Sequence, residues 1–334
     1  MPLVATSNDV AKLAGVSQAT VSRVLANGVV SDATRRKVLA AAAQVGYVPN
    51  LGARAMKTGR VDTIGVVVAD LTNPFYPEIL DALTTTLNAA GQKVTLWNSD
   101  GPGNDAALHA IRAGSVDGVV FTTVTESSEP LREALARRSP VVLVNRVVEG
   151  LSCDQVSGEN REGGAAVAEY LLRHGHRAVA LLGGPTSAST SRDRGMGYEA
   201  ALTGSGVTLE PQWNQRGPFT HEFGFRAMTA LMTGQVVPTA VFCTNDLIAF
   251  GALDAVRSLG LSVPRDVWIV GFDDVDMARW PSFDLTTVHQ PTKEMAASAV
   301  RILLDRIADP ETPPRHSTFS CRLVVRGSTD HAHA

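Results

Sequence analysis

The first fifty residues follow a helical pattern of apolar positions. Two groups of apolar residues repeat at three- and four-residue spacing: Val10, Leu13 and Ala14, then Val21, Val24 and Leu25. This spacing predicts two short helices within residues 6–25, each with one apolar face. Thr6 with Asp9 fits a capping box at the first helix, Gly15 fits a tight turn, and Ser17 fits a cap of the second.

A third helix is predicted from Ser31 to a stop at Gly46. Four apolar residues are expected to face inward along it: Val38, Leu39, Ala42 and Val45. Three short helices, with a glycine turn between the first two, predict a helix-turn-helix unit.

Beyond residue 61 the pattern changes to short apolar runs that alternate with helical periodicity. The apolar runs predict buried strands at 63–69, 93–97, 118–121, 140–144, 178–182, 240–243 and 267–271. Helical patterns between them include 77–90, 162–174, 224–232 and 247–259. The alternation predicts a doubly wound α/β body. Because seven strands exceed one comfortable sheet, we expect two lobes with a ligand cleft at the carboxyl ends of the strands.

Composition places the chain among ordinary globular proteins. The 334 residues are 44% hydrophobic and 19% charged, and no apolar run approaches the ~18–20 residues of a membrane helix. The start shows no secretory signal, and the three cysteines lack CxxC pairing. We therefore expect a cytoplasmic protein with no membrane partner, no cofactor and no metal site.

The net charge of −3 divides unevenly along the chain. Residues 1–60 carry eight basic and two acidic side chains, or +6, whereas the remainder carries 22 basic and 31 acidic ones, or −9. A basic head on an acidic body indicates a polyanionic partner for the head, although a solvated charged face is the alternative.

The outward positions of the second helix carry side chains suited to DNA. Gln18 can bond an adenine edge, Arg23 a guanine edge, and Ala19 can contact a thymine methyl. The hydroxyls of Ser17, Thr20 and Ser22 suit phosphates. A helical hairpin that merely packs is the alternative.

These residues belong to longer blocks that resemble the head and hinge of the lactose/galactose repressor (LacI/GalR) family. The blocks are 9–17, 20–25, 46–50 and 53–54. Further blocks resemble the body of that family, in order: 70–76, 145–146, 181–185, 244–246, 271–274 and 285–288. The resemblance spans nearly the whole chain.

The resemblance implies an N-terminal all-α head and a body of two Rossmann-like lobes of the type I periplasmic-binding-protein fold. We expect a helix-turn-helix domain at 1–49, a hinge at 50–60, and an effector-binding and dimerisation domain at 61–334. The N-lobe is expected at about 61–158 and 291–318, and the C-lobe at about 160–288 and 320–330.

The resemblance also implies the DNA-contacting residues. These are Thr6, Ser17, Gln18, Ala19, Thr20, Ser22, Arg23, Asn27, Asn50, Ala53, Arg54, Met56 and Lys57. Met56 stands where the family has a leucine that wedges into the minor groove, and its flexible thioether chain can serve the same purpose.

Effector contacts are implied at the strand ends: Asp70, Phe75, Tyr76, Asn145, Arg146, Arg194, Phe219, Asn245 and Asp273. A carboxylate, a guanidinium and aromatic faces suit a polyhydroxy ligand. A sugar or sugar phosphate is the first expectation, with a nucleoside or another polar metabolite as alternatives. Several of these residues could instead cap a helix, pack in the core or hydrogen-bond the backbone of a loop.

The resemblance therefore implies an effector-controlled transcriptional regulator, most simply a repressor, which we expect to bind double-stranded operator DNA as a homodimer. We expect no enzyme and no catalytic residues: the GxGxxA at 101–106 fits a surface turn, and Phe225 replaces the second histidine of HExxH at His221. A transport solute-binding protein is the competing reading of the body. No leucine heptad is visible near the C-terminus, so we expect a dimer and not a coiled-coil tetramer.

Overall fold

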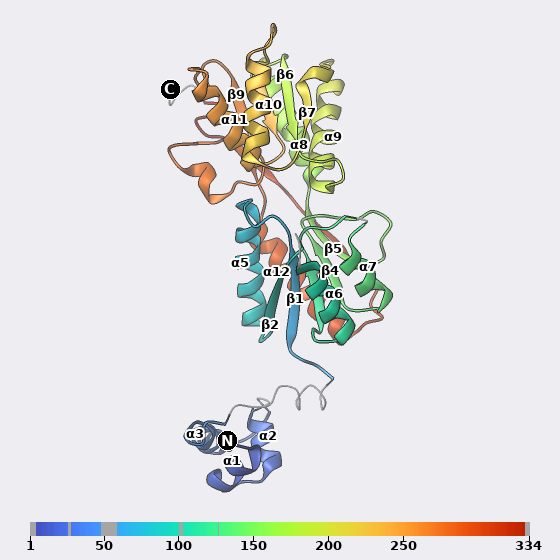
Figure 1. Ribbon diagram of the computed structural model, residues 1–334, viewed down its shortest axis with the longest axis vertical. Helices are drawn as coiled ribbons and strands as arrows, with labels where there is room; N and C mark the ends of the chain where they lie inside the picture. Colours follow the sequence, from blue (N-terminus) through green and yellow to red (C-terminus); the bar gives the residue numbers. More distant parts are fainter. Residues whose placement is uncertain (1–4, 26–27, 48–58, 100–102, 126, 331–334) are drawn as a thin grey trace. The chain divides into compact units, whose positions relative to one another are not determined.

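The structure, a computed structural model, describes residues 5–25, 28–47, 59–99, 103–125 and 127–330. The chain divides into two compact units, with the boundary between Val61 and Asp62. Figure 1 shows a helical first unit and an α/β second unit. Each unit is described by itself.

The head contains α1 (Ser7–Ala14), α2 (Gln18–Leu25) and α3 (Asp32–Gln44). Thr6 and Asp9 form the predicted capping box, and Gly15 has a left-handed φ of 66° that ends α1. The small core consists of Val10, Ala11, Val21, Val24, Val38, Ala41 and Ala42.

Two residues that the helical pattern assigned to this core lie outside it. Leu13 is 47% exposed and Leu39 is 49% exposed. Three helices of 8, 8 and 13 residues do not surround every apolar position, because so small a unit buries a low fraction of its surface.

The N-lobe is built on a six-stranded parallel sheet with the order β11-β5-β4-β3-β1-β2. Its strands are β1 (Thr63–Val68), β2 (Lys93–Asn98), β3 (Gly118–Phe121), β4 (Val141–Val144), β5 (Asp154–Gly158) and β11 (His316–Phe319). Helices α5 (Phe75–Ala89) and α12 (Thr292–Ala308) cover one face, and α6 (Gly103–Ala113) and α7 (Glu129–Ala136) cover the other.

The C-lobe repeats this plan on a four-stranded parallel sheet with the order β7-β6-β8-β9. Its strands are β6 (Val179–Gly183), β7 (Asn214–Arg216), β8 (Ala240–Cys243) and β9 (Trp268–Val270). Helices α8 (Asn160–Arg173) and α9 (Ser189–Gly204) pack together, as do α10 (His221–Met232) and α11 (Asp246–Ser258). Short 3₁₀ turns lie at Pro211–Trp213 and Asp276–Arg279. The two-lobed α/β prediction is confirmed.

Helices α8 and α9 approach backbone to backbone because glycines face the contact. A Cβ on Gly164 would lie 2.0 Å from the carbonyl oxygen of Arg194, and one on Gly197 would lie 1.8 Å from that of Arg161. Close packing here fixes where α9 presents its side chains.

The chain passes between the sheets three times. The first passage follows β5, the second follows β10 (Thr287–His289), and the third follows β11. After the third passage, β12 (Arg322–Val324) pairs antiparallel with β10. Parallel strands point their carboxyl ends toward the same edge, so the loops after β1, β4, β6, β8 and β9 converge between the lobes.

Strand β5 was not predicted because its sequence, DQVSG, is polar although all five residues are buried. The Asp154 carboxylate accepts from the Arg306 guanidinium at 3.0 Å, and the Gln155 amide bonds both backbone groups of Val148. A hydropathy pattern does not predict the burial of polar residues whose hydrogen-bond partners lie in distant segments of the chain.

In the part of the chain that the structure describes, every helix is too short or too polar to cross a membrane.

Candidate functional site

The head presents the predicted reading residues on the outside of α2. Ser17, Gln18, Ala19, Ser22 and Arg23 are exposed, whereas Thr20 is half-buried. The Ser17 hydroxyl accepts from the Thr20 backbone N–H at 3.2 Å and so caps the helix. These positions leave the N-terminal end of α2 open to a polyanion.

Two further side chains of the head have structural partners. Gln18 Nε2 donates to Ser7 Oγ at 2.9 Å, which steadies the glutamine from α1. The Thr6 hydroxyl, also exposed, bonds the Asp9 carboxylate at 2.7 Å. Of the remaining predicted DNA contacts, Asn27, Asn50, Ala53, Arg54, Met56 and Lys57 lie outside the described residues.

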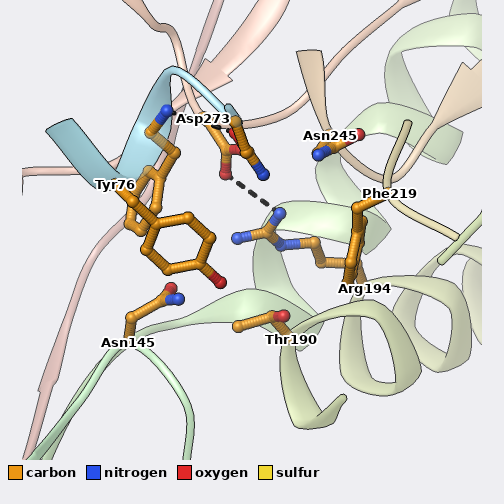
Figure 2. A pocket seen from close by; sticks show the side chains of 9 residues that line it. Tyr76, Asn145, Thr190, Arg194, Phe219, Asn245 and Asp273 are labelled. Atoms are coloured by element: carbon orange, nitrogen blue, oxygen red, sulfur yellow. Dashed lines mark hydrogen bonds and ion pairs between the residues drawn. The ribbon is translucent and has the colours of Figure 1, made fainter. Parts of the chain in front are cut away.

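In the body, nine residues from both lobes surround a cavity. They are Asn73, Phe75, Tyr76, Asn145, Thr190, Arg194, Phe219, Asn245 and Asp273. The space among them, with its opening, amounts to about 230 Å³. Figure 2 shows Tyr76 and Asn145 facing Arg194 and Asp273 across the cavity, with Phe219 and Asn245 at the right of the view.

Arg194 and Asp273 form the charged centre of this wall. Arg194 Nη1 lies 3.0 Å from Asp273 Oδ1, with 3% and 5% of the two side chains exposed. The guanidinium also donates to Asn160 Oδ1 at 2.8 Å and to the Thr244 carbonyl at 2.7 Å. It lies 3.7 Å from the ring centroid of Phe272. These contacts fix the guanidinium plane and neutralise the charge locally.

Burial raises the pKa of the Asp273 carboxyl, while Arg194 and the amide of Gln290, which donates to Oδ1 at 2.8 Å, lower it. No described residue bonds Asp273 Oδ2. The carboxylate therefore keeps one acceptor for a ligand.

Two buried amides of the wall also carry one unbonded atom each. Asn245 Oδ1 accepts from the Ile248 N–H at 3.0 Å and caps α11, so its Nδ2 must be the unbonded donor. Asn145 Oδ1 has no partner among the described residues. Since unpaired buried polar groups are unfavourable, both point to a polar ligand that completes their bonding.

Aromatic rings form the remaining wall. Phe75 and Tyr76 meet edge to face, with centroids 5.5 Å apart. Burial raises the pKa of the Tyr76 phenol, whose oxygen accepts from Arg146 Nη2 at 3.3 Å. Arg146 also lies 5.8 Å from the centroid of Phe219, so it contacts two residues of the wall without lining the cavity itself.

The cavity thus gathers seven of the nine predicted effector residues. Asp70 and Arg146 do not line it. Asp70 instead accepts from the Thr72 hydroxyl at 2.6 Å in the turn after β1.

Two lining residues were missed as effector contacts. Thr190 precedes Arg194 by one turn of α9, a spacing that places both on one face. Asn73 Oδ1 accepts from the Phe75 N–H at 3.2 Å, as expected of a capping residue, but the residue also lines the cavity.

The arrangement suits binding of a small polar molecule, since its donors, acceptors and ring faces are all preorganised. No group of three or more metal-ligating side chains gathers anywhere in the described ranges.

Known proteins resemble both units. Residues 6–50 match the family model of "Bacterial regulatory proteins, lacI family", and residues 168–329 match that of a "Periplasmic binding protein-like domain". The ribose operon repressor of Escherichia coli (strain K12) is 33% identical over 97% of this chain and 99% of its own length.

Two solved structures extend the comparison. A complex of the transcriptional regulator CelR with cellobiose is 31% identical, has a TM-score of 0.75, and covers 97% of this chain and 99% of its own. The Lac repressor dimer bound to operator and the anti-inducer ONPF is 27% identical with a TM-score of 0.84, covering 98% and 99%. From its head, its two-lobed body and these relatives, the chain belongs to the LacI family of bacterial transcriptional repressors, which join a DNA-binding head to an effector-binding body.

Proposed function

We propose that this protein binds operator DNA as a homodimer and that a small uncharged polyhydroxy molecule, held between the lobes, controls its affinity. One observation carries the proposal: a head with an exposed reading helix is joined to a body whose lobes enclose unpartnered polar groups. The Lac repressor dimer bound to operator supports the DNA and dimer parts. A body that senses a metabolite for transcription acts in the cytoplasm, beside the DNA.

The exposed face of α2 supports DNA reading. Gln18 and Arg23 offer bidentate bonds to adenine and guanine, and Ala19 offers a methyl contact to thymine. Two heads related by a dimer axis would read two half-sites of a pseudopalindrome. Met56, Lys57 and their neighbours would add minor-groove and phosphate contacts.

The polar groups of the cavity support an uncharged ligand. Among the described residues that line the cavity, the one cation is Arg194, which is already paired with Asp273. The groups still open include one acceptor on Asp273, the amide of Asn145 and a donor on Asn245. Hydroxyl groups both donate and accept, so a sugar satisfies this set, whereas a phosphate would face an acceptor on Asp273. The cellobiose complex of a relative supports a sugar.

Control of DNA binding would follow from the position of the cavity. The effector contacts both lobes, so it favours one lobe arrangement by the difference in its affinity for the two. The three passages between the lobes transmit that arrangement to the N-lobe, from which the chain leads to the head.

The test begins with the intact chain and a pool of random DNA duplexes. We expect selection of a two-fold symmetric site whose affinity falls as salt rises. Arg23→Ala should lower discrimination at one base pair per half-site by ~1–3 kcal/mol, while Lys57→Ala should weaken binding more uniformly across sequences.

The selected duplex then serves in a titration with free sugars, their phosphates and nucleosides. We expect one free sugar to change the operator affinity, and Asn245→Ala to weaken that response. Absence of sequence-selective binding would contradict the DNA part, whereas a response to phosphorylated sugars alone would contradict the uncharged effector.

A further inference from the structure

The carboxylate of Asp246 is buried beside the cavity but does not line it. The residue is 1% exposed, follows the lining residue Asn245, and begins α11. Burial raises the pKa of its carboxyl, and the charge of Asp273 raises it further. Burying a carboxyl group costs free energy unless hydrogen bonds compensate for the lost hydration. The hydrogen bonds of Asp246 therefore indicate its role.

Asp246 bonds two segments that are distant in sequence. Its Oδ2 accepts from the Val275 N–H at 3.0 Å, and its Oδ1 accepts from the Thr287 hydroxyl at 2.5 Å. Its own N–H donates to the Phe272 carbonyl at 2.8 Å. Asp246 therefore holds the loop after β9 at both ends and joins that loop to β10.

The loop between those bonds has an unusual backbone. Asp273 has a φ of 128° and Asp274 a φ of 57°, conformations that L residues rarely adopt without support from their surroundings. A Cβ on Gly271 would lie 2.2 Å from Asp246 Oδ1, so the backbone runs directly against this carboxylate. The strained turn aims Asp273 at Arg194 and at the cavity.

We propose that Asp246 is the positioning residue of the cavity: it holds the 271–275 loop so that Asp273 meets Arg194, and through Thr287 it fastens that loop to the strand leading to the second passage between the lobes. The proposal rests on the proposed function only in treating the cavity as the effector site. Its test needs neither effector nor DNA.

The test is hydrogen exchange of the intact protein with four variants. Asp246→Ala should accelerate exchange of the Val275 amide at least about tenfold, because its buried acceptor is lost. Asp246→Asn should stay within about threefold of the parent, because the amide oxygen still accepts from Val275 and its nitrogen can donate to the Thr287 oxygen. Thr287→Val should accelerate exchange in the 271–275 loop without unfolding the body.

The control is Asp254→Ala, which removes an exposed acid of the same helix that pairs with Arg257. It should leave the loop unchanged. The buried Nε–H of Arg194 supplies a spectroscopic readout: its slowly exchanging nitrogen resonance should persist in the parent, Asp254→Ala and Asp246→Asn, and be shifted or lost in Asp246→Ala.

Three results would overturn the proposal. The first is parent-like exchange and Arg194 resonance in Asp246→Ala. The second is acceleration spread evenly over the body, which would make Asp246 a general stabiliser. The third is an Asp246→Asn variant as fast as Asp246→Ala, which would show that hydrogen bonding does not position the loop. If Asp246→Ala does not fold, Asp246→Asn and Thr287→Val still decide the matter.

Discussion

Arg194 Nη1 and Asp273 Oδ1 lie 3.0 Å apart in the wall between the lobes, where 3% and 5% of their side chains are exposed. Removing one partner leaves the other charge buried without compensation. We expect Arg194→Ala to lower the free energy of unfolding by ~3–5 kcal/mol, measured by urea denaturation of the body.

A matched control lies two residues away on the same helix. Arg192 pairs with Glu149, with 34% and 79% of the side chains exposed, so Arg192→Ala should lose at most about 1 kcal/mol. Combining Arg194→Met with Asp273→Asn should recover part of the loss. Equal losses for the Arg194 and Arg192 variants would contradict this account.

Helix α9 offers two glycines in opposite surroundings. A Cβ on Gly197 would collide with the carbonyl of Arg161, whereas one on Gly204 would meet open space. Gly197→Ala should destabilise the body by ~1–3 kcal/mol or more, since two backbones must separate. Gly204→Ala should stabilise it by up to ~1 kcal/mol. Thermal unfolding measures both, and a harmless Gly197→Ala would disprove the close approach.

The capping box of α1 can be tested in the intact chain by following exchange in the head. Thr6→Ala removes the acceptor of the Asp9 N–H and a partner of the Asp9 carboxylate. We expect a loss of ~1 kcal/mol in the stability of the head. Hydrogen exchange should accelerate in α1 and α2 and stay constant in the body. Asn8→Ala, an exposed neighbour, serves as the control.

Asp246 makes stability depend on pH in an unusual direction. Burial, with the nearby charge of Asp273, raises the pKa of its carboxyl to about 8 in the folded body, from an ordinary value of 3.8. Between these values the folded state binds more protons than the unfolded state, so this group makes stability fall as pH rises. Denaturant titrations from pH 5.5 to 8.5 should show that slope, and Asp246→Asn should reduce it. An unchanged slope in the variant would exclude Asp246 as its source.

How far the sequence predicts this molecule depends on where each residue finds its partners. Apolar runs such as 118–121 predict their strands because burial alone drives them. Strand β5 is not predicted from the sequence because Asp154 is buried against Arg306, a partner about 150 positions away. Leu13 shows the opposite error: helical spacing predicts that it faces the core, but 47% of it stays exposed.

The cavity shows the same division. Sequence motifs predict Arg194 and Asp273 as effector contacts, and the structure brings the two side chains together. Thr190 cannot be predicted in this way, because its role depends on which face of α9 is turned to the cavity. Asp246 stood within a recognised block, but its bonds to Val275 and Thr287 become visible only once three separate segments are folded.

The head ends at Val61 and the body begins at Asp62, one residue before β1 starts at Thr63. Such a junction crosses one peptide and interrupts no sheet register. A head from a relative joined at this point would leave every hydrogen bond of the body's sheets in place, so we expect such a chimera to keep the stability of this body.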